Sequence, residues 1–378
     1  MRRAPFVLLA AALAFTAPAA AQPAGERGAA AGSGAPEISA GDGTLYLAAF
    51  PSRIFVIDEA TASVVDEIAV PHGPPRALVA SADRSRFHFV DTTFEHMTTV
   101  DVAAREVTDS FTLSEGNRKV RIRSFRVAPD GATAILHVDA AVKLIDRYEV
   151  EPYRLLEVDL ATHEVLRELP WPTGAASFGS RMLFSPDGEY LYFFDREDIL
   201  ILEADTFDEV DRWSLREPIE PGMGRMQFSF DDDLLYEEPG FFTNLFTVHD
   251  DAQDRELMGV ARIDLPNREV VDFYTLGPAR PIQFALAPGR RMAYGLSSSI
   301  DHYEFWTFHL DERRIGSRRP IEGRPRMALD VSTNGEVLYI SSAGNTIDYY
   351  DADSFDHLHT LTLDGDMTSG LIVMPPAP

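Results

Sequence analysis

Seven times along the chain, an apolar segment ends near an acidic residue, passes through a short polar turn and continues in a second alternating segment. The first two copies read IFVIDEATASVVDEIAV and MTTVDVAAREVTDSFTL. The acids recur at Asp58, Asp101, Asp159, Asp205, Asp264, Asp311 and Asp351. Self-similarity at a period of roughly 40 to 50 residues is typical of repeat architectures, so this repeat restricts the fold more than any other feature of the chain.

A second series of segments alternates with the first, and FSPDGEYLYF at residues 184–193 is its clearest copy. Asp-Gly and Asn-Gly suit a tight hairpin, because these residues accept positive φ. Each repeat therefore predicts four short strands, which is the composition of a β-propeller blade. We expect an all-β fold, a seven-bladed β-propeller of four-stranded blades. A β-helix or a pair of β-sandwiches is the alternative interpretation.

The two ends of the repeat complement each other. The first unit, residues 43–70, has room for only three strands, whereas SGLIVMP at residues 369–375 matches the start of a unit that has no continuation. We therefore expect the C-terminal strand to complete the N-terminal blade and close the ring. Closure also removes the free edge strands that favour aggregation.

The N-terminal residues have the layout of a secretory signal peptide. Arg2 and Arg3 precede an apolar run at residues 5–14, which is too short to span a bilayer, and small residues at 19–21 offer a cleavage site. Residues 22–37 are rich in Ala, Gly and Pro and predict a flexible leader. The expected organisation is a signal peptide at 1–21, a leader at 22–37 and a propeller at 38–378, exported to the periplasm.

Charge and cysteine content narrow the classes of function. The formal net charge of −26 becomes −28 when Arg2 and Arg3 leave with the signal peptide, which contains no acid. Such a surface repels phosphate backbones, so we expect no nucleic-acid partner, although solubility alone also accounts for the charge. Because the chain has no cysteine, it cannot carry a disulfide, a c-type haem, a thiolate zinc site or a cysteine-derived quinone of its own.

Two intervals between the recurring acids are long. We place the excess between the second and third strands of blades three and five, at residues 137–159 and 237–264, and expect both insertions on one face of the ring. The inner strands begin at the same face with Arg76, Arg123, Arg181, Arg225, Arg280 and Arg326. These arginines predict a cationic channel mouth that attracts an anionic ligand or an acidic partner, unless each pairs with a carboxylate of a neighbouring blade.

The insertions also contain aromatic residues. Phe241, Phe242 and Phe246 lie in the blade-five insertion, and Tyr148 and Tyr153 lie in the segment DRYEVEPYR of blade three. Exposed aromatic side chains beside charge are common anchors of protein interfaces, so all five are candidates for partner contact. The three phenylalanines equally suit a small core within their insertion.

Signals for chemistry on this chain are weak. His357 and His359 share one face of a strand without a third ligand nearby, and the acidic segment at residues 249–254 lacks the spacing of a calcium loop. The chain contains neither a Gly-x-Ser-x-Gly elbow nor a phosphate-binding glycine loop after a strand. We therefore expect no catalytic residue, metal or cofactor on this chain, and a binding or scaffold role.

The repeat with its Ser-Pro-Asp-Gly turns resembles the exported YVTN-type seven-bladed propellers, which include lactonase-like enzymes and dehydrogenase subunits. A more specific likeness is VRIRSFRVAPDGATAILHVDAAVKLIDRYEVEPYRLLEVDLATHEV at residues 120–165, which looks like the corresponding blade of the β subunit of quinohemoprotein amine dehydrogenase. TNLFTVHDDAQDRELMGVARIDL and VSTNGEVLYISSAGNTIDYYDADSF look like later parts of the same subunit. The methylamine dehydrogenase heavy chain is a more distant match.

This resemblance implies a propeller subunit that is not catalytic by itself but helps to wall the pocket for a primary amine. It implies partners that hold the cofactors: a small subunit with cysteine tryptophylquinone and a dihaem cytochrome subunit with haem c. The alternatives are a stand-alone lactonase-like hydrolase that uses acidic and His residues at the channel mouth, and a module that binds a ligand or a protein.

Overall fold

The computed structural model describes residues 38–174, 181–195, 197–217, 221–229, 235–299, 302–323, 327–341 and 343–376. The predicted signal peptide, the leader and Arg326 lie outside these residues. The described residues belong to one compact unit, Pro36–Pro378. They contain strands and turns only, and no helix among them is long and apolar enough to cross a membrane.

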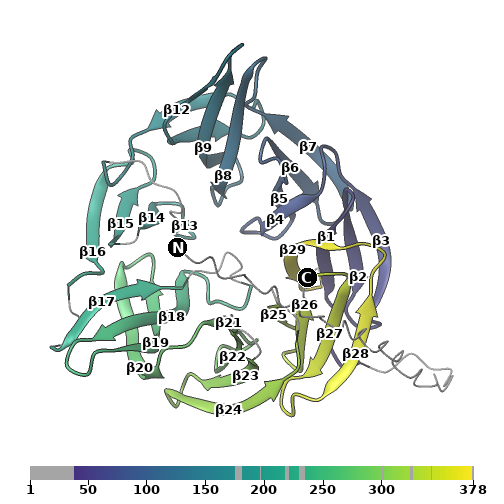
Figure 1. Cartoon of the computed structure of the whole chain (residues 1–378), viewed down its shortest axis with the longest axis vertical. Helices are drawn as coiled ribbons and strands as arrows, with labels where there is room; N and C mark the ends of the chain where they lie inside the picture. The colour runs from purple at the N-terminus through teal and green to yellow at the C-terminus, as the bar shows by residue number, and fades with distance from the viewer. Residues whose placement is uncertain are drawn as a thin grey trace, which may run out of the picture. The chain divides into compact units, whose positions relative to one another are not determined.

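The predicted fold is confirmed: seven four-stranded antiparallel sheets form the blades of a β-propeller (Figure 1). From the innermost strand outward, blade one consists of β29 (Met367–Met374), β1 (Thr44–Ala49), β2 (Arg53–Asp58) and β3 (Ser63–Ala69). Blade two consists of β4 (Pro75–Ala80), β5 (Arg86–Asp91), β6 (His96–Asp101) and β7 (Glu106–Thr112). Blade three consists of β8 (Arg118–Val127), β9 (Thr133–Lys143), β11 (Arg154–Asp159) and β12 (Val165–Leu169), with the short β10 (Tyr148–Val150) paired to β9.

The remaining blades have the same order. Blade four consists of β13 (Arg181–Phe184), β14 (Tyr190–Phe194), β15 (Asp198–Glu203) and β16 (Glu209–Ser214), blade five of β17 (Met223–Phe228), β18 (Phe241–Asp250), β19 (Arg255–Asp264) and β20 (Glu269–Pro278), blade six of β21 (Ile282–Leu286), β22 (Met292–Ser299), β23 (His302–His309) and β24 (Arg314–Ile321), and blade seven of β25 (Ala328–Val331), β26 (Val337–Ser341), β27 (Thr346–Asp351) and β28 (His357–Thr362).

The C-terminal strand closes the ring as predicted. β29 pairs antiparallel with β1, with Leu47 opposite Leu371 and Leu45 opposite Val373. Alternate residues of β29 enter two different cores, because Leu371 and Val373 pack with blade seven whereas Ile372 and Met374 pack with blade two. The last strand of the chain therefore joins three blades.

The hydrophobic core lies between the blades. Among the described residues, each of seven apolar clusters is shared by two adjacent blades. A blade has two apolar faces, and it buries them only against its neighbours. This arrangement explains why the two middle strands of a blade are almost continuously apolar, as in TLYLAA of β1 and DILILE of β15.

The turn between the third and fourth strands is the same in every blade. Its fourth residue has positive φ, and these residues are Ala62, Arg105, His163, Phe207, Arg268, Arg313 and Phe355. The acid before the turn accepts backbone N–H bonds, as Asp159 does from Thr162 at 2.7 Å. Two of the recurring acids that we predicted at strand ends, Asp205 and Asp311, lie inside this turn instead. The third strands of their blades end at Glu203 and His309.

The blade-three insertion lies where it was predicted, between β9 and β11. The long strands β8 and β9 project from the ring (Figure 1), and β10 pairs back on β9 with Val150 opposite Ala141. We call residues 139–151 the arm. Glu151 holds its base, since its two carboxylate oxygens accept bonds from Arg118 Nε at 2.7 Å and Nη2 at 2.8 Å.

The predicted position of the blade-five insertion is wrong. Residues 241–250, which we placed in an insertion after the second strand, form the second strand β18 itself. The added residues lie partly in the long connection between β17 and β18, where the tight hairpin turn was expected, and partly in the longer strands β18 and β19. Pro239 and Gly240 end the connection, and Leu235 and Tyr236 before them pack into apolar clusters rather than pairing as a strand.

Candidate functional site

The ring has two different faces. The inner strands begin at one face, which we call the arginine face, and the arm projects there because it extends the beginning of β8. The turns between first and second strands lie at the opposite face, which we call the turn face. The connection between β17 and β18 belongs to the turn face, so the two long segments do not share one face as expected.

Arg76 and Arg123 meet at one aromatic ring on the arginine face. The guanidinium of Arg76 lies 4.8 Å from the ring centre of Phe94, and that of Arg123 lies 5.5 Å from it. Arg123 also forms a bidentate ion pair with Asp139, with Nη2 2.9 Å from Oδ2. The carboxylate partner of Arg123, Asp139, thus lies on the same blade as Arg123, whereas the neighbouring blade two supplies the aromatic ring of Phe94.

The other predicted arginines lie at the beginnings of their inner strands. Arg181 is the first residue of β13, Arg225 is the third of β17, and Arg280 precedes β21, and all three are exposed. The structure therefore places five of the six at the arginine face, and Arg326 lies outside the described residues. Whether they attract an anion or an acidic partner stays a prediction.

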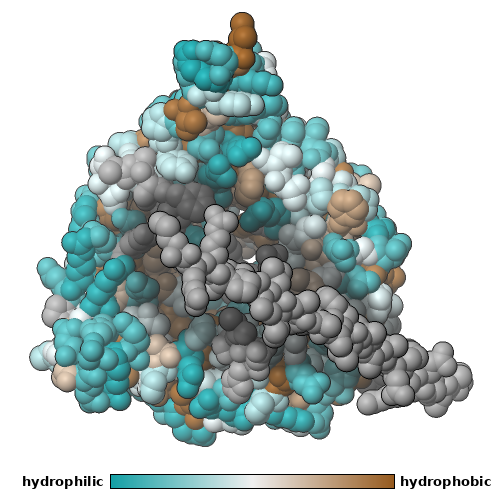
Figure 2. Space-filling model, viewed as in Figure 1, coloured by the Kyte–Doolittle hydropathy of each residue, from teal (hydrophilic) through white to brown (hydrophobic). Residues whose placement is uncertain are grey.

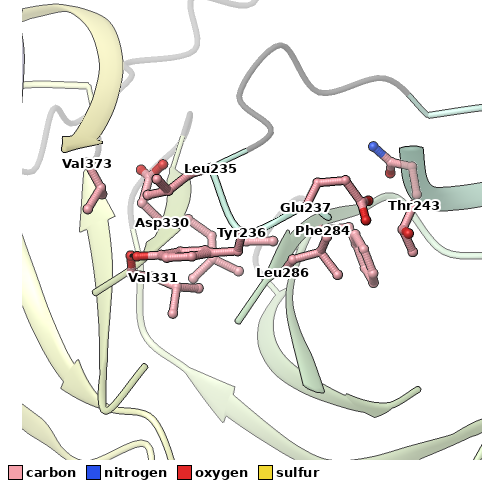
Figure 3. A pocket seen from close by; sticks show the side chains of 12 residues that line it. Leu235, Tyr236, Glu237, Thr243, Phe284, Leu286, Asp330, Val331 and Val373 are labelled. Atoms are coloured by element: carbon pink, nitrogen blue, oxygen red, sulfur yellow. The ribbon is translucent and has the colours of Figure 1, made fainter. Parts of the chain in front are cut away.

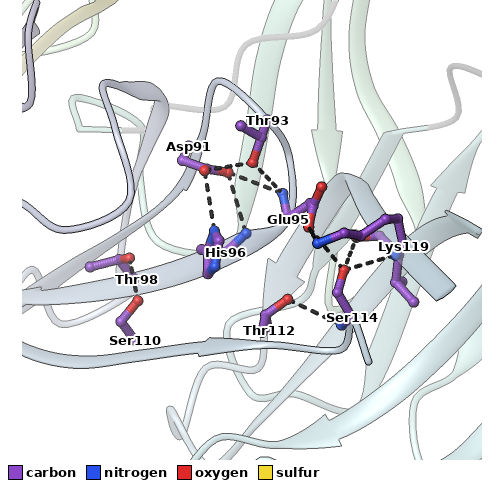
Figure 4. A network of polar contacts seen from close by, with 10 residues as sticks. Asp91, Thr93, Glu95, His96, Thr98, Ser110, Thr112, Ser114 and Lys119 are labelled. Atoms are coloured by element: carbon purple, nitrogen blue, oxygen red, sulfur yellow. Dashed lines mark hydrogen bonds and ion pairs between the residues drawn. The ribbon is translucent and has the colours of Figure 1, made fainter. Parts of the chain in front are cut away.

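The beginning of β8, which pairs with the arm, contacts a loop of blade two that a polar network holds in place (Figure 4). The buried Asp91 accepts the backbone N–H of Glu95 at 3.0 Å, and its other oxygen lies 3.2 Å from His96 Nδ1. Glu95 in turn pairs with Lys119 of β8 at 2.8 Å, and the backbone N–H of Ile122 bonds Phe94 O at 2.7 Å. These contacts fix the direction in which the arm leaves the ring.

The arm presents apolar side chains to solvent. Ile145 is fully exposed, and Tyr148 and Val150 are 65% and 76% exposed. The hairpin is nevertheless ordered by bonds such as Leu144 N–H to Arg147 O at 2.8 Å. Figure 2 shows this apolar surface at the tip of the arm, above a largely hydrophilic surface. Such apolar exposure on a rigid projection is typical of protein interaction sites.

Tyr153 lies at the base of the arm and is half-buried. Its ring makes an edge contact with His137 at 5.2 Å, and His137 also contacts Trp171 at 5.0 Å. His137 is buried, and desolvation lowers its pKa to about 4. His88 of β5, which contacts Thr99 Oγ1 at 2.9 Å, is buried likewise, and its pKa also falls to about 4, chiefly through desolvation and then through Arg86.

These two histidines predict a stability that falls with acidification. In the unfolded chain they take up protons as the pH falls through about 6.5, whereas in the folded protein they remain neutral down to about 4. Protons therefore favour the unfolded state between these values, and His88 alone accounts for up to about 3 kcal/mol of lost stability. Urea unfolding of His88→Gln and of the unaltered chain at pH 7 and pH 4.5 measures this, and equal pH dependence in both would contradict it.

The turn face is filled near its centre by residues 235–240, which we call the plug. Leu235 packs against the core shared by blades one and seven, and Tyr236 donates its hydroxyl to Val331 O at 2.9 Å. Arg290 of blade six donates from Nε to Tyr236 O at 3.0 Å. Figure 3 shows Tyr236 between the inner strands, with Val373 of β29 beyond it. The plug thus connects blade five with blades one, six and seven.

A cavity of about 310 Å³ opens between the plug and the ends of β4, β8 and β13. Its wall is mostly apolar, with Leu183 and Phe184 on blade four and Phe241 and Leu265 on blade five. Arg84, Arg126, Glu237 and Glu238 also line it. The side chain of Glu238 pairs with Arg262, whose guanidinium lies 4.1 Å from the ring centre of Phe241. This volume and lining suit a small organic ligand.

The three predicted phenylalanines separate. Phe241 lines the cavity on the turn face, whereas Phe242 and Phe246 are 1% and 0% exposed in the core between blades four and five. Alternation along β18 explains the difference, since even-numbered residues point into that core. Phe242 and Phe246 are therefore core residues, but of the core between two blades rather than of a small core within an insertion.

Sequence reasoning overlooked Arg84 and Arg290. Both occupy the position of the turn that is Gly131, Gly188 and Gly335 in blades three, four and seven, and both have positive φ, 56° and 61°. A side chain is unfavourable there, so an arginine in place of glycine marks an exception to the repeat. Arginine instead of glycine at the fourth position of SADRS and APGRR was the available signal. Arg84 lines the cavity, and Arg290 holds the plug.

The weak metal signals remain unsupported by geometry. His357 Nε2 contacts Thr360 Oγ1 at 2.9 Å, and His359 packs against the ring of Tyr349. His249 lies near Asp251, Asp254 and Glu256 on the exposed hairpin of blade five. Within the described residues, no cluster of three or more His, Cys, Asp or Glu side chains is arranged to bind a metal.

No protein-family model matches the chain, and no curated protein sequence matches it significantly. Solved structures resemble it in fold. Dihydro-heme d1 dehydrogenase NirN, in complex with DHE, aligns with a TM-score of 0.53 and 14% identity over 90% of this chain and 77% of its own. A functionally unknown protein from Desulfotomaculum acetoxidans DSM 771 aligns with a TM-score of 0.53 and 12% identity over 89% of this chain and all of its own (100%). Apo AztD from Citrobacter koseri aligns with a TM-score of 0.50 and 12% identity over 88% of this chain and 98% of its own. At these identities they show the propeller fold alone.

Proposed function

We propose that this chain is the non-catalytic propeller subunit of a quinohemoprotein-type amine dehydrogenase in the periplasm. In this proposal the arm and the arginine face bind a small subunit that carries cysteine tryptophylquinone. A dihaem cytochrome subunit with haem c accepts the electrons, and the propeller helps to wall the pocket for a primary amine. The observation that carries the proposal is the arm, with its exposed Ile145, Tyr148 and Val150.

The arm supports docking because its apolar side chains are presented on an ordered hairpin. The bidentate Arg118–Glu151 pair and the Lys119–Glu95 pair limit its movement, so binding a partner costs little conformational entropy. The arm also lies within residues 120–165, the segment that most resembles the amine dehydrogenase subunit. Arg76 beside its base adds a cationic group for an acidic partner.

Affinity purification of the tagged chain from its native cells tests this role. We expect a haem-containing protein and a small subunit to co-purify, and the complex to reduce an artificial electron acceptor when a primary amine is added. The chain alone is expected to be inactive. Its recovery as a monomer without a haem protein would contradict the proposal.

Substitution of the arm tests the docking surface itself. The double variant Ile145→Asp/Val150→Asp is expected to recover at least about tenfold less partner, because charge replaces apolar contacts at the interface. Its melting temperature is expected to stay unchanged, since both side chains are exposed. Val65→Asp/Val271→Asp on outer strands is the matched control and is expected to retain the partner. Full recovery with the arm variant would exclude the arm as the docking surface.

A second candidate function is a stand-alone module that binds a small molecule, and the cavity on the turn face favours it. Its apolar wall and volume suit a ligand, whereas the described residues that line it include no histidine for the hydrolase alternative. Turnover of a lactone by the purified chain would support the hydrolase, and ligand-dependent stabilisation without turnover would support the binding module.

A further inference from the structure

A second, smaller cavity lies on the other side of the plug, and the carboxylate of Glu237 in it forms no ion pair with the described residues. Its volume is about 60 Å³, and residues of β18, β21, β25 and β29 surround it. Glu237 of the plug reaches into it beside Thr243 of β18 (Figure 3). This cavity is independent of the arm and of the proposed function.

Glu237 is 93% buried, at 7% exposure, and only one of its carboxylate oxygens has a partner. Oε1 accepts the backbone N–H of Glu238 at 3.1 Å. Oε2 is buried and accepts no hydrogen bond from the described residues. Arg290 lies nearby but donates to the backbone oxygens of Tyr236 and Glu237, at 3.0 and 3.4 Å, rather than to the carboxylate.

An unpaired buried carboxylate is costly, so native proteins supply a partner for it. Besides Glu237, the polar side chains that line this cavity come from the plug, β18 and β25, and they are those of Tyr236, Thr243, Asn244 and Asp330. The Asn244 Oδ1 already accepts Leu245 N–H at 2.8 Å. Phe284 and Leu286 complete an apolar wall that gives the charge no further support. The cavity is larger than the roughly 10 to 15 Å³ that one water needs, so it has room for an ion with some of its waters.

We propose that this cavity binds a hard metal cation of the size of Ca²⁺ or Na⁺, with Glu237 Oε2 as its anionic ligand. Thr243 offers a neutral oxygen, and oxygen ligands select hard cations over zinc or copper. The strongly acidic chain raises the local concentration of cations. The cation joins the plug to β18, because Glu237 lies on the plug whereas Thr243 lies on the strand that follows it.

Thermal unfolding of the purified chain after EDTA treatment tests the site. Addition of Ca²⁺, or of Na⁺ in a separate titration against a bulky organic cation, is expected to raise the melting temperature of the unaltered chain by several degrees. Glu237→Gln, which keeps the shape but not the charge, is expected to lose this increase. In EDTA the variant is expected to be at least as stable as the unaltered chain, because it removes an unpaired buried charge.

Two matched variants make the result specific. Glu238→Gln alters the adjacent acid, which pairs with Arg262, and is expected to retain the full response to the cation. Thr243→Val removes a neutral oxygen, and is expected to weaken cation binding at least about tenfold in calorimetry while the protein stays folded. No response to either cation, equal responses in the unaltered chain and Glu237→Gln, or a response to Zn²⁺ alone would each overturn the proposal.

Discussion

Removal of β29 is expected to prevent the chain from folding. Leu371, Ile372, Val373 and Met374 are each at most 5% exposed, and they fill two cores at once. Burial of such a side chain contributes about 1.5 to 3 kcal/mol, so the four together approach the whole stability of a typical domain, about 5 to 15 kcal/mol. The truncation also leaves the inner edge of β1 unpaired, which favours aggregation.

Soluble yield and circular dichroism of a chain that ends at residue 366 measure this effect. A chain that ends at residue 374 is the control, because it keeps β29 and removes only the residues that follow it. We expect the control to unfold at the temperature of the full chain. A soluble chain ending at 366 with cooperative unfolding near that temperature would show that β29 does not hold the ring closed.

Replacement of Glu59 is expected to cost at least about 3 to 5 kcal/mol of unfolding free energy. Glu59 is completely buried in the third turn of blade one, and its carboxylate accepts bonds from Gly43 N–H at 2.7 Å and Tyr339 Oη at 2.7 Å. It also accepts the backbone N–H of Thr333 at 2.8 Å and the Thr333 hydroxyl. Each buried donor left without an acceptor costs about 1 to 3 kcal/mol.

The position of Glu59 explains why its replacement is expected to be costly. It joins blade one to blade seven, the junction at which the ring closes, and Gly43 approaches so closely that a Cβ there would lie 2.6 Å from Glu59 Oε2. Burial raises the pKa of Tyr339, and the charge of Glu59 raises it further, so the tyrosine remains a donor. Glu59→Gln presents its amide hydrogens to other donors, and we expect it to lose more than half as much stability as Glu59→Ala.

Chemical denaturation of both variants measures this loss. Glu67→Ala provides the control, because Glu67 pairs with Arg53 at 2.9 Å on the surface, and exposed ion pairs contribute about 0 to 1 kcal/mol. A loss below about 1 kcal/mol in Glu59→Ala would mean that water takes over its four bonds.

The repeat allowed the fold to be predicted because its signals are local and were repeated seven times. Asp-Gly turns and the acid before the third turn gave the blade count, and the unmatched last strand gave the closure. Blade five was mispredicted because LLYE follows a polar turn and has the composition of a short strand, although Leu235 and Tyr236 find their partners in blades one and seven. Such partners are distant in sequence, and a local pattern cannot reveal them.

The candidate site was predictable only where it follows from the repeat. The arginines at the beginnings of inner strands and the arm in blade three were placed from the spacing alone. The cavity of the turn face was missed, because it depends on the plug and on Arg84. Core and surface positions of neighbouring aromatics were also ambiguous, since Phe241 and Phe242 differ only in the face of β18 to which they point.

The pairing of β1 with β29 also sets the order in which the molecule can be completed. β1 is the first strand of the described chain and β29 is the last. The inner edge of β1 therefore stays unpaired until almost the whole chain has been synthesised. Pairing between such distant segments is slow, because the entropy of closing the loop is lost before the contacts form. Ring closure is therefore the final step, and a chain whose last strand is still inside the ribosome remains open.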